Sequence, residues 1–223
     1  MYKLVMTALA SAAALTAFGA NAPAHAAAGD VLVRVRAIDV IPNESSGSIL
    51  PSFPGEEVSV NNAIVPEIDF TYMLTDYIGF ELIAATSKHR ISGKTGTTGS
   101  IGQLASTYVL PPTLTVQYHL IPTGKFHPYV GAGLNYTFFY KDKASAGLQG
   151  AVGQTSVHLS DSFGWAGQVG MDIDVADNLF VNFDVKYIDM RTKARLNTTA
   201  LGLETVRVKL NPIVVGIGVG FRL

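Results

Sequence analysis

Charged side chains that recur at every second position carry most of the chemistry available to this chain. Arg34 and Arg36 are two residues apart, and so are Asp184 and Lys186. Side chains at alternate positions of an extended strand lie on the same face. Charges that share a buried face must pair and hydrogen-bond, because an unpaired buried charge is strongly destabilising. The spacing therefore predicts an internal network of paired charges rather than a reactive site.

Histidine and serine show no catalytic arrangement in the sequence. His119 follows Thr and Gln positions, His89 and His158 lie at or near long connections, and His127 lies beside a short one. No Ser-His-acid spacing brings a nucleophile and a base together, and scattered histidines predict no metal site. The chain has no cysteine and therefore no thiolate nucleophile or ligand. We expect no catalytic residue, no metal ion and no cofactor.

Composition limits the class of protein. The chain has 223 residues, a formal net charge of -1 and 15% charged residues, so nothing indicates nucleic-acid binding. Its 22 glycines and 48% hydrophobic residues suit a compact β protein with many tight turns. The length is that of one all-β domain.

The first 26 residues resemble a removable targeting segment. Lys3 precedes an apolar run from Leu4 to Phe18, and "APAHAAAGD" offers small-residue cleavage sites. We predict a cleaved signal peptide over residues 1–26 and a mature domain over 27–223; an uncleaved membrane anchor is the alternative. No later run reaches the roughly 18 apolar residues of a membrane helix, so a mature chain that spans a membrane must form a closed barrel.

Alternation of apolar and small or polar residues predicts eight strands in the mature chain. In the terminal stretch "NPIVVGIGVGFRL", Ile213, Val215 and Ile217 alternate with Gly216 and Gly218. Each segment has about the nine to eleven residues that cross an apolar band of roughly 25 Å when tilted. The eight segments are residues 31–40, 64–74, 78–86, 111–120, 129–140, 163–175, 179–190 and 211–223.

The connections between these segments alternate in length. Short connections cover residues 75–77, 121–127 and 176–178, whereas long ones cover 42–63, 91–106, 141–160 and 191–204. This order predicts an all-β, eight-stranded antiparallel up-and-down transmembrane β-barrel with its short turns at one end. A soluble ligand-binding barrel would alternate in the same way, but its outer face would be rich in Lys and Glu rather than Gly, Thr and Asn.

Aromatic residues near strand ends fit the girdles that line membrane interfaces. They are Phe70, Tyr72, Tyr77, Tyr118, Tyr129, Tyr136, Phe138, Phe163, Trp165, Phe180 and Tyr187.

The inward faces predict two layers in the lumen. Near the short turns and the middle we expect a plug of paired charges, formed by Arg34, Arg36, Asp69, Glu81, Asp184, Lys186 and Arg222. Above it we expect an apolar cup that binds small hydrophobic molecules, lined by Ile38, Val40, Ile83, Val109, Phe139, Ile188 and Met190. A cup closed below by charges cannot be a straight water channel, so its ligand needs a side exit.

Two consecutive prolines suggest where that exit lies. Pro111 and Pro112 fall in the fourth predicted strand, and neither can donate a ladder hydrogen bond. They predict a lateral seam in the barrel wall; the alternative is that both lie at the strand's rim, where prolines are tolerated.

Several blocks of sequence resemble one family. "TYMLTDYIGFELIAAT" (Thr71 to Thr86), "LPPTL" (Leu110 to Leu114), "HPYVGAGLNYTFFY" (His127 to Tyr140), "DSFGWAGQVGMDID" (Asp161 to Asp174) and "YIDMRTKA" (Tyr187 to Ala194) are similar to the OmpW family of outer-membrane proteins, which includes the AlkL-type hydrocarbon-uptake barrels. The resemblance implies a monomeric barrel in the outer membrane of a Gram-negative cell. It also implies passive uptake of small hydrophobic molecules, released sideways into the membrane through a gap in the wall.

Two departures from the family pattern bear on function. A family tryptophan at the channel floor matches Lys186 here and its leucine partner matches Ile83, so the floor carries a charge. Family members usually end in an aromatic residue read by the outer-membrane assembly machinery, whereas this chain ends in Leu223.

We expect that machinery, membrane lipid and lipopolysaccharide as partners, besides small hydrophobic solutes. The alternative function is a structural or adhesive barrel whose extracellular loops bind partners.

Overall fold

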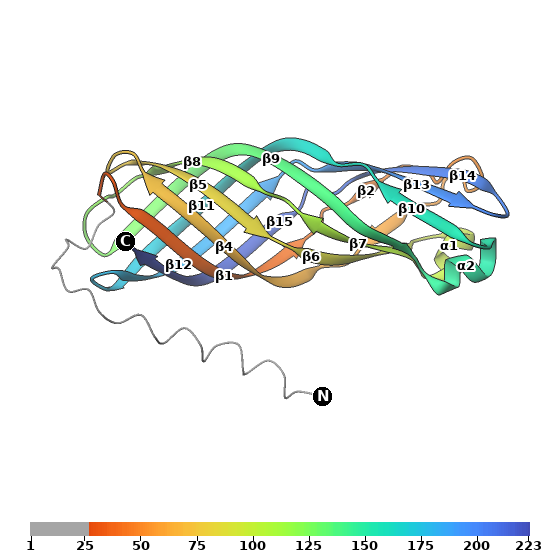
Figure 1. Cartoon of the computed structure of the whole chain (residues 1–223), viewed down its shortest axis with the longest axis horizontal. Coiled ribbons are helices and arrows are strands. Elements are labelled where there is room, and N and C mark those ends of the chain that lie inside the picture. The colour runs from red at the N-terminus through yellow and green to blue at the C-terminus, as the bar shows by residue number, and fades with distance from the viewer. Residues whose placement is uncertain (1–26) are drawn as a thin grey trace, which may run out of the picture.

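The computed structural model describes residues 27–223, which form an elongated β structure with the short connections at one end (Figure 1). The predicted signal peptide, residues 1–26, lies outside the described residues. Within them, no helix is long and apolar enough to cross a membrane.

Eight antiparallel strands close into a barrel. Each strand pairs with its neighbours along the chain, and the last strand pairs with the first from Leu32 opposite Arg222 to Ile41 opposite Ile213. This confirms the predicted eight-stranded barrel. The barrel strands are β1 (Val31–Ile41), β4 (Ala63–Met73), β5 (Ile78–Ala85), β8 (Thr113–His119), β9 (Phe126–Ala144), β11 (Ser162–Ala176), β12 (Leu179–Ile188) and β15 (Ile213–Arg222).

The four long connections are not irregular loops but build an extension of the barrel. β9 runs without a break from the barrel into this extension, and α1 and α2 lie at its far end (Figure 1). A four-stranded sheet in the order β10-β13-β14-β2 forms another part of the extension. The elements of the extension are β2 (Ser45–Ser46), β3 (Val58–Val60), β6 (Ser87–Gly93), α1 (Gly96–Ile101), β7 (Gln103–Leu110), α2 (Ala146–Val152), β10 (Thr155–Leu159), β13 (Arg191–Thr198) and β14 (Gly202–Lys209).

The barrel strands place their apolar side chains outward and their polar side chains inward. On β4, Ile68 and Phe70 are exposed, whereas Asp69 and Thr71 are fully buried. A soluble ligand-binding barrel would have the opposite arrangement. An outward apolar band over a polar lumen is the pattern of a membrane-spanning barrel.

Most of the predicted girdle aromatics do face outward, and Trp165 and Tyr187 pack together there with ring centroids 5.2 Å apart. The prediction was wrong for Tyr129 and Phe180, which are buried inside the barrel. Both lie on the inward side of the alternation, next to arginine side chains that need aromatic and polar neighbours.

Glycines on the inward faces make room for these large side chains. A Cβ atom on Gly170 would meet the Tyr129 ring, and one on Gly220 would meet the Phe180 ring. The small inward residues of the C-terminal strand are therefore needed because the lumen is narrow and must hold these large side chains.

Candidate functional site

The lower lumen is filled by ion pairs around Arg34. This side chain binds Asp172 through two nitrogens, at 2.7 and 3.2 Å, and Asp69 at 3.0 Å. All three side chains are buried. A bidentate arginine–carboxylate pair fixes the orientation of both groups, so this layer is rigid as well as closed.

Arg36 and Lys186 extend the network upward. The Arg36 guanidinium lies 2.8 Å from Glu67 and 2.6 Å from Asp69. The Lys186 ammonium lies 3.0 Å from Glu67 and 2.6 Å from Asp184. Lys186 therefore joins the charged network below to the space above it.

Carboxylates outnumber cations in this part of the plug, and neutral polar side chains supply the remaining hydrogen-bond donors. Donors to the carboxylates include Tyr129, which binds Asp184 at 3.0 Å, and Thr115, which binds Glu81 at 2.8 Å. Asn182 donates to Asp172 at 2.7 Å. The sequence prediction omitted Glu67, Asp172, Asn182 and Tyr129 from the plug, although their inward positions on the alternating strands could have identified them.

Arg222 does not join the network around Arg34 and Arg36. It lies 3.2 Å from Asp174, whose other oxygen lies 2.9 Å from His127. The buried Phe180 ring separates the two groups of charges, with the Arg34 and Arg222 guanidinium carbons 5.5 and 5.8 Å from its centroid. The plug thus has two layers rather than the single one that the sequence predicted.

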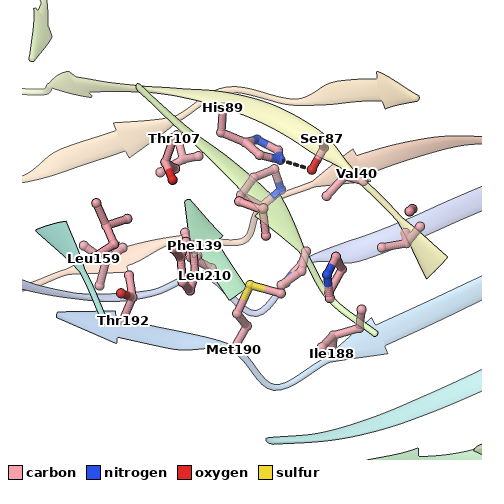
Figure 2. A pocket seen from close by; sticks show the side chains of 18 of the residues that line it. Val40, Ser87, His89, Thr107, Phe139, Leu159, Ile188, Met190, Thr192 and Leu210 are labelled. Carbon is pink, nitrogen blue, oxygen red and sulfur yellow. Dashed lines mark hydrogen bonds between the residues drawn. The ribbon is translucent and has the colours of Figure 1, made fainter. Parts of the chain in front are cut away.

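A mainly apolar cavity lies above the plug. All seven residues predicted to line the cup, Ile38, Val40, Ile83, Val109, Phe139, Ile188 and Met190, line this cavity. The cavity has a volume of about 70 Å³. Lys186 and Glu67 also border the cavity, so its floor carries the charge that the family comparison suggested. Figure 2 shows Phe139, Ile188 and Met190 directed into it.

The upper wall of the cavity comes from the extension and was missed in the sequence. Strands β3, β6, β13 and β14 contribute Val58, Ile91, Ala194 and Val206, which also line a second apolar cavity farther out. Leu148 and Val152 of α2 close that second cavity. The alternating residues of "VSV" (58–60) and "VRV" (206–208) were a usable signal. The first lay in a connection predicted to be a long loop, and the second lay between the predicted connection 191–204 and the last predicted strand, in neither of them.

One wall of the cavity carries a hydrogen-bonded serine and histidine (Figure 2). Ser87 Oγ lies 2.8 Å from His89 Nε2, and His89 Nδ1 lies 2.8 Å from the backbone oxygen of Asn61. The sequence predicts no Ser-His-acid arrangement and gave no notice of this pair, although Ser87 and His89 are two residues apart on one face of β6. The third group here is a backbone carbonyl and not an acidic side chain.

His89 lies in the extension, outside the membrane-spanning strands, where the neighbouring Lys88 and Arg90 are exposed. Burial lowers the pKa of His89, so its imidazole is neutral at neutral pH.

The prolines lie at a break in the barrel wall. Pairing of β5 with β8 ends at Ile83 opposite Thr113, and pairing of β6 with β7 begins at Ser87 opposite Val109. Between them, residues 84–86 and 110–112 face each other with no ladder pair in the described chain. We call this interval the seam. Pro111 and Pro112 thus precede β8, whose predicted start at residue 111 was too early.

The two prolines face opposite neighbours. The Tyr136 backbone N–H donates to the Pro112 oxygen at 3.1 Å, so Pro112 faces β9. Adjacent residues of an antiparallel strand direct their backbone groups to opposite sides, so Pro111 faces the seam, and it also lines the cavity.

Asn135 satisfies the backbone oxygens left at this break. Its side-chain nitrogen donates to Pro111 and Pro112 oxygens at 3.2 and 3.3 Å and to Thr113 Oγ1 at 2.9 Å. Exposed carbonyls are costly in hydrocarbon, and this side chain shields them from the lumen side.

Comparison with known proteins agrees with this architecture. The chain is 38% identical over 196 residues to outer membrane protein W of Vibrio cholerae, covering 87% of this chain and 88% of that one. It is 37% identical over 224 residues to outer membrane protein W of Escherichia coli, covering 100% of both chains. The crystal structure of the outer membrane protein OprG from Pseudomonas aeruginosa superposes with a TM-score of 0.85 at 32% identity, covering 91% of this chain and 99% of that one.

These relatives and the fold define an outer-membrane β-barrel. The sequence model of the OmpW family matches residues 27–223, and the chain belongs to this family. The predicted family and the predicted location in the Gram-negative outer membrane are therefore confirmed.

Proposed function

We propose that this protein is a channel through which small hydrophobic molecules pass passively across the outer surface of the membrane and leave sideways into its hydrocarbon layer. The observation that carries the proposal is an apolar cavity that is closed below by ion pairs and reaches the seam at Pro111. A hydrophobic molecule in such a cavity meets a lower free-energy barrier when it leaves through the seam than when it passes through the buried charges.

The floor argues against a straight path for water or polar solutes. Lys186, Glu67 and Asp184 are buried, and Lys186 pairs both with Glu67 of β4 and with Asp184 on its own strand. Opening a water path would require these pairs to separate. Transfer through the lower barrel is therefore not part of the proposal.

The seam supports a side exit because it lacks strand pairing and has small residues along one side. Ala84, Ala85 and Thr86 lie on that side, and Leu110 and the two prolines lie on the other. On the outside, a 2.7 Å hydrogen bond joins Thr86 Oγ1 and Tyr140 Oη. Separating the strands here breaks this bond but no ladder hydrogen bonds between residues 84–86 and 110–112.

The decisive experiment uses two variants, each of which restores one backbone N–H donor. Pro111→Thr restores the donor that faces the seam, and Pro112→Thr restores the donor that faces β9. Uptake of n-octane and of a small polar solute is measured in cells with intact outer membranes that carry the native protein, Pro111→Thr, Pro112→Thr or no copy. We expect the native protein to speed uptake of octane alone and Pro111→Thr to abolish that gain, because it restores a donor facing the seam. Pro112→Thr is the matched control, because its donor faces β9, and should retain octane uptake.

Other outcomes would contradict the proposal in different ways. Equal uptake of both solutes with and without the protein favours the structural or adhesive barrel whose loops bind partners. Faster uptake of the polar solute alone means that the ion pairs do open a water path. Loss of octane uptake in Pro112→Thr but not in Pro111→Thr places the exit on the other side of β8.

We also propose the partners of this barrel. Apart from the seam, the eight barrel strands of the described chain form a closed ring in which each strand pairs with both neighbours, which supports a monomer. Leu223 pairs with Val31 and continues the outward alternation, which supports recognition of the last strand by the assembly machinery. The proposed role involves passage and no chemical change of the solute.

Lipopolysaccharide is the partner that we propose for the outward face of β13 and β14. Arg191 lies opposite Lys209, and Lys193 lies opposite Arg207. Like charges directly opposite each other destabilise a strand pair, and phosphate groups would neutralise them.

A further inference from the structure

The hydroxyl groups that line the cavity already donate hydrogen bonds to other groups of the protein. Thr107 Oγ1 donates to Asp142 at 2.6 Å, and Thr192 Oγ1 donates to the Ser160 oxygen at 2.7 Å. Thr113 Oγ1 donates to the Pro111 oxygen at 2.9 Å. Each of these three threonines thus donates its single hydroxyl proton to an acceptor within the protein.

The proton of the fourth hydroxyl follows from the histidine. The Asn61 oxygen only accepts, so His89 Nδ1 carries the proton that is donated to it. In the neutral imidazole, Nε2 is then an acceptor without a hydrogen, and Ser87 Oγ donates to it at 2.8 Å. No hydroxyl proton of the cavity-lining residues in the described chain is therefore left for a ligand.

Ser87 Oγ keeps unused acceptor capacity, because a hydroxyl oxygen has two lone pairs. No protein group in the described chain donates to this oxygen. It is buried and lines the cavity among apolar side chains. A buried acceptor gains most from a partner that can donate.

We propose that Ser87 and His89 form a selectivity site for solutes that are apolar except for one hydroxyl group. The inference rests on the proposed function, that the cavity receives small hydrophobic molecules. The solute's hydroxyl donates to Ser87 Oγ while its hydrocarbon part contacts the cavity. A ketone of the same carbon skeleton has only an acceptor and meets an acceptor there. Among the described residues that line the cavity, Lys186 is the one permanently charged cation, and it lies on the floor.

The geometry favours recognition over hydrolysis. A serine hydrolase needs donors aimed at the developing oxyanion, whereas the neighbouring threonine protons are already bound to protein acceptors. The backbone carbonyl of Asn61 also takes the place of the acidic group that would stabilise a charged imidazole.

The test compares 2-octanol with 2-octanone, which share a skeleton and differ in the donor. Binding is measured by saturation-transfer NMR on protein in lipid nanodiscs, with empty nanodiscs to subtract partition into lipid. We expect the native protein to bind the alcohol about fivefold more tightly, as one neutral hydrogen bond gives.

Two variants give opposite results if the inference is correct. His89→Leu frees the Ser87 proton to donate to a ligand, so the preference shifts toward the ketone. Ser87→Ala leaves His89 Nε2 as an acceptor facing the cavity, so the preference for the alcohol stays. Thr192→Val is the matched control, because its hydroxyl is already bound to Ser160, and should leave the ratio at the native value.

The outcomes separate this inference from the proposed function. If both compounds bind saturably and equally to the native protein and to His89→Leu, the selectivity site is wrong and the apolar cavity stands. If neither compound binds above empty nanodiscs, the proposed function itself fails. An unchanged alcohol preference in His89→Leu would also overturn the assignment.

Discussion

At the residue scale, the plug depends on cations that each neutralise more than one carboxylate. Arg36→Ala would leave Glu67 and Asp69, which lie two residues apart on the inward face of β4, without their shared guanidinium. Removing one partner of a buried ion pair typically costs about 3–5 kcal/mol, so we expect a loss of that size in the free energy of unfolding.

The measurement is urea unfolding in lipid vesicles, followed by the fluorescence of Trp165, which is the single tryptophan of the chain and faces outward. Lys125→Ala is the control, because this exposed residue lies at a short turn. A loss below about 1 kcal/mol for Arg36→Ala would show that water reaches the plug and solvates the carboxylates.

Single residues of the site were predictable where the alternation of a barrel strand decided their direction. All seven cup residues and the charges from Arg34 to Lys186 were placed on inward faces from the alternation alone. Alternation gives the direction of a side chain but not its height along the barrel axis or its partner. The separate pairing of Arg222 with Asp174 was therefore missed. The Ser87 and His89 pair was missed because their strand was not recognised beyond residue 86.

At the element scale, α1 is held by a carboxylate from a distant segment. Glu56 accepts from the backbone N–H groups of Thr97 and Thr98 at 2.9 and 2.8 Å and from the Thr98 hydroxyl. The Thr98 side-chain hydrogen bond is the largest of the contacts that lower the pKa of Glu56 below its ordinary value of 4.5. The contact therefore stabilises α1 fully above pH 4.5 and is lost as the pH falls through the lower, folded-state pKa.

We expect the hydrogen-exchange protection factors of Thr97 and Thr98 to fall as the pH is lowered below 4.5. Glu56→Gln should show low protection at every pH, because a neutral amide is a weaker acceptor than a carboxylate. Native protection factors that stay constant down to pH 2 would mean that packing of α1, and not this contact, holds the end of the extension.

The elements themselves were only partly predictable. The barrel strands have strict alternation because one face meets lipid and the other the lumen. The extension strands lie above that band, so their outward faces carry Lys, Arg, Ser and Thr in no fixed order. Their apolar inward residues are brought together only when β9 continues past the membrane and provides an edge for β7.

At the scale of the whole molecule, charge is distributed in a way that suits the outer leaflet. The basic residues Arg191, Lys193, Arg195, Arg207 and Lys209 lie on one face of β13 and β14, where Lys193 is half-buried and the other four are exposed. This face begins four residues beyond Tyr187, an aromatic of the outward apolar band. This is the level at which the phosphate groups of lipopolysaccharide, the partner that we propose for this face, would meet the protein.

Reversing one charge on this face distinguishes a lipopolysaccharide site from a solvated surface. Arg207→Glu places opposite charges at the Lys193 pair, so without lipopolysaccharide we expect it to stabilise the protein by about 0.2–1 kcal/mol. In the same variant, binding of purified lipopolysaccharide to detergent-solubilised protein should weaken and become less sensitive to salt. Lys125→Glu makes the same charge change at the short-turn end and should alter neither property. If Arg207→Glu stabilises the protein but binds lipopolysaccharide as the native chain does, the opposed charges are only a local strain that the barrel tolerates.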